Sequence, residues 1–271
     1  MRTLVHLSDL HFGRVDPAVI DPLLAYVEQS KPNVVVVSGD LTQRARSAQF
    51  QQARSFLDRL PWPQIVVPGN HDVPMYDPLS RFTRPYRKYQ RYISDDLEPM
   101  HADSELVVLG VNTARALTVK GGRINVEQMA RVRQRLAVFD AGVTKVIVTH
   151  HPFDLPPEHT EKDLVGGADV AMAMFAECGV DLLLAGHLHV THTASTAARY
   201  RIEGHAALVV QAGTATSSRG RGESNSFNVV RIDRPGVTVE HVTWLPEQGQ
   251  FAVSSTERFV LTPRGWSAPL A

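Results

Sequence analysis

The sequence is poor in three features, and each shortage excludes a class of protein. Cys178 is the single cysteine among 271 residues, so no internal disulfide can form and nothing points to an oxidising compartment. No stretch approaches the roughly 20 apolar residues that span a bilayer, and the polar N-terminal segment does not resemble a signal peptide. Lys and Arg together number 28, as do Asp and Glu, so the chain lacks the basic field of an extended nucleic-acid surface. We therefore expect a globular, cytoplasmic protein without a transmembrane segment.

Short apolar runs alternate with amphipathic stretches over residues 1–193. Several runs are continuous and rich in Val and Ile, which is typical of strands covered on both faces. The predicted strands are Thr3–Leu7, Val34–Val37, Ile65–Val67, Leu106–Val111, Lys145–Val148 and Val180–Ala185. The predicted helices are Pro17–Gln29, Ser47–Leu60, Asn125–Phe139 and Asp169–Cys178. This alternation predicts an α/β fold with a parallel or mixed sheet.

The pattern changes near residue 193. Later apolar runs are joined by turns, with no helical pattern between them. They are Ala206–Ala212, Phe227–Ile232, Val237–Trp244 and Arg258–Leu261. We expect residues 194–271 to form a second, antiparallel sheet that completes the same domain. Residues 1–271 are therefore predicted to be one domain, with the functional motifs in residues 1–193.

Polar clusters follow five of the predicted strands. They are Ser8-Asp9-Leu10-His11, Ser38-Gly39-Asp40, Gly69-Asn70-His71-Asp72, His150-His151-Pro152 and Gly186-His187-Leu188-His189, and they hold six of the 12 histidines. Carboxyl ends of strands meet at one edge of an α/β sheet, which is where such sheets bind ligands. Asp, Asn and His suit divalent ions of the Mn, Fe, Co and Zn group. The five clusters together predict a metal centre.

These motifs, read in order as D-x-H, G-D, G-N-H-D, H-x-P and G-H-x-H, resemble those of the calcineurin-like metallophosphoesterases. The resemblance runs from Leu4 to about His189. It implies two mixed β-sheets packed as a sandwich and flanked by helices. It also implies two divalent metal ions per chain, which would be Mn, Fe, Zn or Co.

The resemblance assigns a role to each motif residue. It implies that one ion is held by Asp9, His11 and His189. It implies that the other is held by Asn70, His150 and His187, with Asp40 bridging the two. His71 is implied to be a catalytic residue that is not a ligand. Asp72 is implied to orient or polarise His71.

The resemblance also implies a reaction. Two ions can hold a bridging hydroxide that attacks phosphorus, while His71 protonates the leaving oxygen. The predicted protein is thus an enzyme, a metal-dependent phosphoric ester hydrolase. A non-enzymatic scaffold is a further alternative, but it predicts missing ligands, and all five motifs are intact.

The substrate is less well specified by the sequence. Residues 39–44 differ from the G-D-x-V-D-R-G motif of protein phosphatases, and His71 stands where one branch of UDP-diacylglucosamine pyrophosphatases has Arg. We expect a small phosphorylated substrate, with a 3′,5′-cyclic nucleotide as the first candidate. A glycerophosphodiester, UDP-diacylglucosamine by another lineage of that activity, and a phosphomonoester remain alternatives that use the same centre.

Several residues are candidates for substrate contact. Arg115 follows a strand end and is either a phosphate ligand or a surface ion pair; His151 and His192 lie beside metal motifs. The segment Tyr76–Tyr92 mixes basic and aromatic residues, so it is either an overhang of the site, a helix packed on the core, or a contact in a homodimer. The loop Gly213–Asn225, with Arg219 and Arg221, is either a cover for the ligand or an exposed flexible loop.

Overall fold

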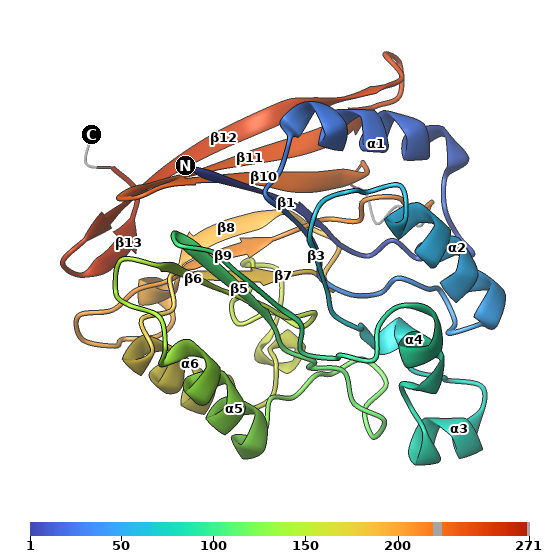
Figure 1. The fold of residues 1–271 in the computed structure, drawn as a ribbon, viewed down its shortest axis with the longest axis horizontal. Coiled ribbons are helices and arrows are strands. Elements are labelled where there is room, and N and C mark those ends of the chain that lie inside the picture. The colour runs from blue at the N-terminus through green and yellow to red at the C-terminus, as the bar shows by residue number, and fades with distance from the viewer. Residues whose placement is uncertain (219–223, 270–271) are drawn as a thin grey trace.

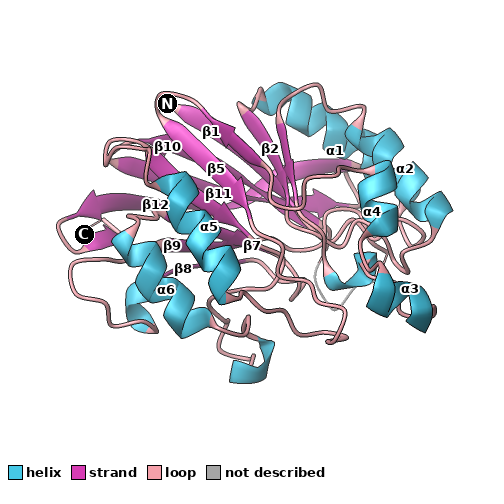
Figure 2. Cartoon of the chain, turned by 60° about the horizontal axis from the view of Figure 1, so that its bottom comes forward, coloured by secondary structure: helices cyan, strands magenta, loops and turns pink. Residues whose placement is uncertain are grey.

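Two β-sheets packed face to face form the centre of the molecule, as a computed structural model of the chain shows for residues 1–218 and 224–269 (Figure 1). The first sheet has seven strands in the order β13-β12-β11-β10-β1-β2-β3, and the second has six in the order β4-β5-β6-β7-β9-β8. Helices α1 and α2 lie beside the first sheet, and α5 and α6 cover the second (Figure 2). The predicted α/β sandwich with flanking helices is confirmed.

The elements have the following bounds. The first sheet contains β1 (Arg2–Leu7), β2 (Val34–Val37), β3 (Gln64–Val66), β10 (Ser226–Asp233), β11 (Gly236–Leu245), β12 (Gln250–Thr262) and β13 (Gly265–Ser267). The second contains β4 (Met100–Ala102), β5 (Leu106–Gly110), β6 (Thr144–Val148), β7 (Leu182–Ala185), β8 (His192–Ser195) and β9 (Leu208–Gln211). The helices are α1 (Pro17–Ser30), α2 (Ser47–Leu57), α3 (Pro78–Thr83), α4 (Arg87–Tyr92), α5 (Val126–Leu136) and α6 (Ala168–Glu177). Within residues 1–218 and 224–269, none of the helices has the length and apolar character that crossing a membrane requires.

The continuous valine run of β2 shows why these strands lack an alternating pattern. Val34 and Val36 pack into the core between the two sheets, whereas Val35 and Val37 pack into the core beneath the helices. All four side chains are fully buried because apolar layers cover both faces of the strand. Strand β6 follows the same rule, with Val146 between the sheets and Ile147 under α5 and α6.

The strands after residue 193 do not form a sheet of their own, which corrects our expectation of a second, antiparallel sheet. Strand β9 pairs in parallel with β7, and β10 pairs antiparallel with β1. Each therefore extends a sheet that the first part of the chain begins. The physical reason is that β1 and β7 each have a free edge once β2 and β6 are in place, and a buried edge needs hydrogen-bond partners.

Strand β12 is much longer than the sequence predicts. We expect a strand over Arg258–Leu261, whereas the structure has one over Gln250–Thr262. The prediction misses residues 250–257, and within them residues 254–256 are exposed and polar, so the apolar pattern is interrupted there. The backbone of this segment pairs with β11 instead. Ladder hydrogen bonds along an existing strand, which leave no apolar signal in the sequence, account for the difference.

The parallel strands bring the five polar clusters together. Strands β1, β2 and β3 run parallel in one sheet, as do β5, β6 and β7 in the other. Each cluster follows the carboxyl end of its strand, so all five lie along the same rim of the sandwich. The fold thus places the predicted metal motifs at one site.

Candidate metal centre

The backbone at this rim is unusual. Five predicted ligands have left-handed backbones, a conformation that non-glycine residues rarely adopt: Asp9 (φ 53°), His11 (φ 49°), Asp40 (φ 51°), His187 (φ 75°) and His189 (φ 64°). Each such residue costs roughly 1–3 kcal/mol and persists only where its surroundings enforce it. The strain is concentrated in the residues that the sequence assigns to metal binding, which supports a functional role for these turns.

Asp9, His11 and His189 form the first set of facing ligand atoms. Nε2 of His11 lies 3.2 Å from Nε2 of His189, and Oδ1 of Asp9 lies 3.1 Å from Nε2 of His189 and 3.5 Å from Nε2 of His11. Ligand atoms that share an ion at about 2.1 Å are separated by about 3.0–3.4 Å. The Oδ1 atom of Asp9 is buried and has no hydrogen-bond partner among the described residues. This arrangement fits a divalent ion.

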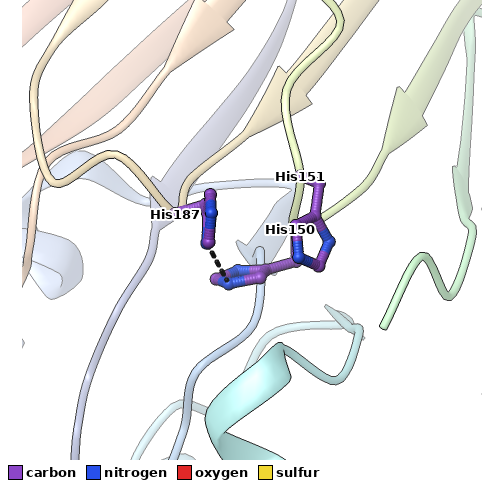
Figure 3. A group of neighbouring side chains, drawn as sticks. All are labelled: His150, His151 and His187. Carbon is purple, nitrogen blue, oxygen red and sulfur yellow. Dashed lines mark hydrogen bonds between the residues drawn. The ribbon is translucent and has the colours of Figure 1, made fainter. Parts of the chain in front are cut away.

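Asn70, His150 and His187 form the second set. Nε2 of His150 lies 3.1 Å from Oδ1 of Asn70 and 3.3 Å from Nδ1 of His187. Figure 3 shows the His150 and His187 rings approaching each other from neighbouring strand ends. The amide nitrogen of Asn70 donates to the carbonyl oxygen of Val119, which leaves its oxygen toward His150. The spacing again fits ligands of one ion.

Asp40 lies between the two sets. Its Oδ1 is 3.4 Å from Nε2 of His150, and its Oδ2 is 3.9 Å from Nε2 of His11. Burial alone would raise the pKa of Asp40, but the neighbouring His150 and His71 hold it below its usual value. The side chain is therefore a carboxylate with one oxygen toward each set. The residues present fit a centre of two divalent ions bridged by Asp40.

His151 lies beside the centre, but both of its ring nitrogens are occupied. Nε2 donates to the carbonyl oxygen of Lys120 at 2.9 Å, so Nδ1 accepts from the hydroxyl of Thr113 at 2.9 Å. Burial lowers the pKa of His151 well below its usual value, so the ring is neutral. His151 therefore ties two loops to the centre, and the structure does not support a substrate contact by this side chain.

His71 is oriented by Gln43 and not by Asp72, which corrects the role that the resemblance implied for Asp72. Nδ1 of His71 donates to the carbonyl oxygen of Gln43 at 2.8 Å, and Nε2 faces Oδ2 of Asp40 at 4.0 Å. Among the described residues, Asp72 has no hydrogen bond or ion pair with that ring. Its carboxylate accepts from the backbone N–H groups of Leu41, Thr42 and Gly69 and from the hydroxyl of Thr42. Asp72 thus joins the loop of Asp40 to the loop of Asn70, because a carboxylate is the acceptor that converging N–H donors require.

Replacing Asp72 with Ala tests this corrected role. The variant leaves three buried backbone donors without their acceptor, and we expect a loss of about 2–4 kcal/mol in the free energy of unfolding, measured with urea. Metal affinity should fall as well, because the two ligand loops are no longer joined. Asp58→Ala, at the exposed end of α2, is the matched control. A loss of turnover at unchanged stability and metal content would instead restore the role of Asp72 in polarising His71.

The remaining substrate-binding candidates lie away from the centre. The guanidinium of Arg115 donates to the carbonyl oxygens of Asn112 and Ala114 and to the side chain of Gln128. Nε2 of His192, on β8, lies 3.7 Å from a carboxylate oxygen of Asp154. Neither residue lines the cavity at the metal ligands. Arg219 and Arg221 lie outside the described residues.

The segment Tyr76–Tyr92 forms the short helices α3 and α4, and only Arg81 and Tyr89 of it are buried. The hydroxyl of Tyr89 donates to the carbonyl oxygen of Val66, and that of Tyr86 donates to Ala114. Arg81 is buried and donates to three backbone carbonyl oxygens, those of Pro74, Ala116 and Thr118. These contacts support the structural interpretation for Arg81, Tyr86 and Tyr89, whereas Tyr76, Leu79 and Phe82 are exposed.

Sequence reasoning missed four residues that line the cavity at the predicted ligands. This cavity, here called the lysine chamber, has a volume of about 140 Å³. Its wall combines predicted metal-site residues with Lys120, His159, Lys162 and Asp163. A second cavity of about 220 Å³, here called the tyrosine chamber, shares Asn70 and His71 and is also lined by Gln43, Arg44 and Tyr76. None of these additional residues belongs to a motif with metal-ligand spacing, so only the folded chain reveals them.

Gly186 has to be a glycine for the first ligand set to form. A Cβ at this position would lie 1.8 Å from Oγ of Ser8 and 2.6 Å from Oδ2 of Asp9. We expect Gly186→Ala to displace Asp9, weaken binding of one ion and lower stability by about 1–3 kcal/mol. Gly142→Ala is the control, because a Cβ there meets nothing within 4 Å. Metal titration together with thermal unfolding measures both effects, and equal behaviour of the two variants would contradict the packing described.

A sandwich with two adjoining sets of Asp, Asn and His ligand atoms at its strand ends defines the class of the dinuclear metallophosphoesterases. The chain belongs to the calcineurin-like phosphoesterase family, whose sequence profile matches residues 2–191. A glycerophosphodiester phosphodiesterase of Enterobacter lignolyticus is 37% identical over 82 residues, which cover 26% of this chain and 29% of that protein. A protein of Synechococcus named as a probable cyclic nucleotide phosphodiesterase is 26% identical over 200 residues, or 69% of this chain and 73% of the other.

Solved structures show the same fold. A purple acid phosphatase from yellow lupin seeds aligns with a TM-score of 0.71 at 13% identity, covering 95% of this chain and 53% of the lupin chain. The chain thus spans about half the length of that structure and less than a third of the Enterobacter relative.

Proposed function

We propose that this protein is a metal-dependent phosphodiesterase acting on a small phosphodiester, with a 3′,5′-cyclic nucleotide as the first candidate. The observation that carries the proposal is the two facing sets of ligand atoms with Asp40 between them, while Nε2 of His71 faces the same carboxylate. The relatives named for cyclic nucleotide and glycerophosphodiester hydrolysis support the diester class. The metals proposed for the two sites are Mn, Fe, Zn or Co, which mixed carboxylate and imidazole ligands accept.

The residues of the chain divide the chemistry between them. Two bound ions would supply Lewis acidity and an activated water. Asp40 sets the distance between the two sites. The hydrogen bond from Nδ1 of His71 to Gln43 leaves Nε2 at the cavity, where its protonated form can donate to the leaving oxygen.

Two chambers meet at His71, and this favours a diester over a monoester. Asn70 and His71 line both the lysine chamber and the tyrosine chamber. An acyclic phosphodiester carries a separate organic group on each of two oxygens, so one chamber is available to each group. A monoester would leave one of the chambers without an occupant.

A substrate panel tests the proposal. Manganese-loaded protein is assayed with cyclic nucleotides, glycerophosphodiesters, UDP-diacylglucosamine, single-stranded DNA, bis(p-nitrophenyl) phosphate and p-nitrophenyl phosphate, comparing kcat/KM. We expect bis(p-nitrophenyl) phosphate to exceed the monoester and a cyclic nucleotide to exceed both. Monoester turnover above the diester would overturn the diesterase assignment. Cyclic-nucleotide turnover below the chromogenic diester would overturn the first candidate alone.

A further inference from the structure

Two lysines stand on the wall of the lysine chamber with free ammonium groups. Lys120 lies in the loop between β5 and α5, and Lys162 lies in the 3₁₀ helix Glu161–Asp163. Both residues are exposed. Neither ammonium has a hydrogen bond or ion pair with the described residues. Their charges are therefore available to a bound molecule.

The backbone beneath Lys120 is anchored to the metal centre. Its carbonyl oxygen accepts from Nε2 of His151 at 2.9 Å, and the carbonyl oxygen of Val119 accepts from the side chain of Asn70 at 3.2 Å. A Cβ on Gly122 would lie 2.2 Å from the His151 ring, so the loop passes very close to that side chain. Lys120 thus projects from a loop that the metal centre itself positions.

The acid that follows Lys162 in the chain and lines the same chamber is already engaged. Asp163 accepts from the backbone N–H of Thr160 at 3.1 Å and lies 3.6 Å from Nδ1 of His159. Backbone N–H bonding from Thr160 is the first cause that lowers the pKa of Asp163. This carboxylate therefore caps its own short helix and does not pair with Lys162.

The charges of the chamber exceed what a simple phosphodiester can balance. Two divalent ions would bring more positive charge than Asp9 and Asp40 of the metal centre offset, and the two lysines outweigh Asp163 by one further charge. A phosphodiester brings one negative charge. The lining of the tyrosine chamber has a single lysine or arginine, Arg44, whose guanidinium lies over the Tyr76 ring at 5.3 Å from its centroid, whereas the lysine chamber has two lysines.

We infer that Lys120 and Lys162 bind a second anionic group, a carboxylate or a phosphate, on the arm of the phosphodiester that enters the lysine chamber. The other arm occupies the tyrosine chamber. The inference rests on the proposed function and applies to its acyclic diesters, among which a diester with one further negative charge should be preferred to one without. Such charge complementarity discriminates between substrates that share the same reacting phosphodiester but differ in the charge of the second arm. A 3′,5′-cyclic nucleotide has a single charge and no separate second arm, so the lysines do not select for or against it in this way.

Three p-nitrophenyl phosphodiesters with the same leaving group test the inference. Their second arms are methyl, 2-carboxyethyl and choline, which are neutral, anionic and cationic. We expect kcat/KM to be highest for carboxyethyl and lowest for choline, with a carboxyethyl-to-methyl ratio of about 5–10, the size of two partly exposed ion pairs. In Lys120→Gln/Lys162→Gln this ratio should fall to about one.

Lys31→Gln is the control, since Lys31 precedes β2 at the end opposite to Asp40 and lines none of the chambers. Calorimetric titration with ethyl 2-carboxyethyl phosphate and diethyl phosphate gives the same comparison without turnover. A ratio near one in the parent protein, or an unchanged ratio in the double variant, overturns the inference. The inference is also overturned if the double variant loses kcat/KM for p-nitrophenyl phosphate alone, because the lysines would then bind a second charge on the phosphoryl group itself. Failure to hydrolyse any diester contradicts the proposed function instead. In that case the calorimetric affinities for the two phosphate diesters still show whether the lysines bind the second anionic group.

Discussion

Asp40→Asn is expected to lose both metal ions and nearly all activity. Asp40 directs one oxygen to each ligand set, with Oδ1 toward His150 and Oδ2 toward His11. An amide at this position is neutral, and its NH₂ group must point at one of the two sets. Loss of a hydrogen bond that supports a metal ligand costs about 10–100-fold in activity. We expect turnover of Asp40→Asn to fall by more than this, because a ligand itself is changed.

Metal analysis of the purified variant by mass spectrometry measures this effect. Asp58→Asn, on an exposed carboxylate outside the rim, is the control and should keep two ions. An Asp40→Asn protein that retains two equivalents of metal would show that Asp40 does not bridge the sites. Loss of a single ion would show that it serves only one of them.

His71→Ala is expected to keep both ions and lose turnover by about 10²–10⁴-fold, the usual contribution of a general acid. His71 lies at the junction of the two chambers and belongs to neither ligand set, so its removal leaves the ligand atoms in place. A proton donor matters most for a poor leaving group. The loss should therefore be larger for an alkyl phosphodiester than for a p-nitrophenyl diester.

The leaving-group comparison separates this role from a structural one. A structural defect would lower turnover of both diesters equally and would also reduce metal content. His101→Ala, on β4, removes a histidine remote from the rim and should change neither quantity. Full activity of His71→Ala with alkyl diesters would eliminate His71 as the proton donor.

Most of the fold follows from the sequence because buried strands and strand ends leave strong local patterns. The valine run 34–37 predicts β2 with its bounds, since both faces of that strand are covered. The polar clusters predict the rim, since parallel strands place their carboxyl ends together. The sequence does not predict in the same way that β10 joins the seven-stranded sheet and β9 the six-stranded one, because strand pairing depends on free edges elsewhere in the fold.

The candidate site divides along similar lines. Asp9, His11 and His189 are predictable because they belong to motifs with metal-ligand spacing, and the structure brings their atoms within 3.5 Å. The partner of His71 is not predictable, because the backbone carbonyl of Gln43 carries no side-chain signal. Lys120 and Lys162 come from a loop and from a 3₁₀ helix far apart in the sequence, which only the tertiary fold brings to one chamber.

The central claim, that two ions held by these residues are needed for phosphodiester hydrolysis, is tested most directly by metal reconstitution. The protein is stripped with chelator and titrated with Mn²⁺ while bound metal and bis(p-nitrophenyl) phosphate turnover are followed together. We predict that the stripped protein is inactive and that turnover reaches its maximum at two equivalents per chain. Full turnover in the stripped protein, or a maximum at one equivalent, would contradict the account.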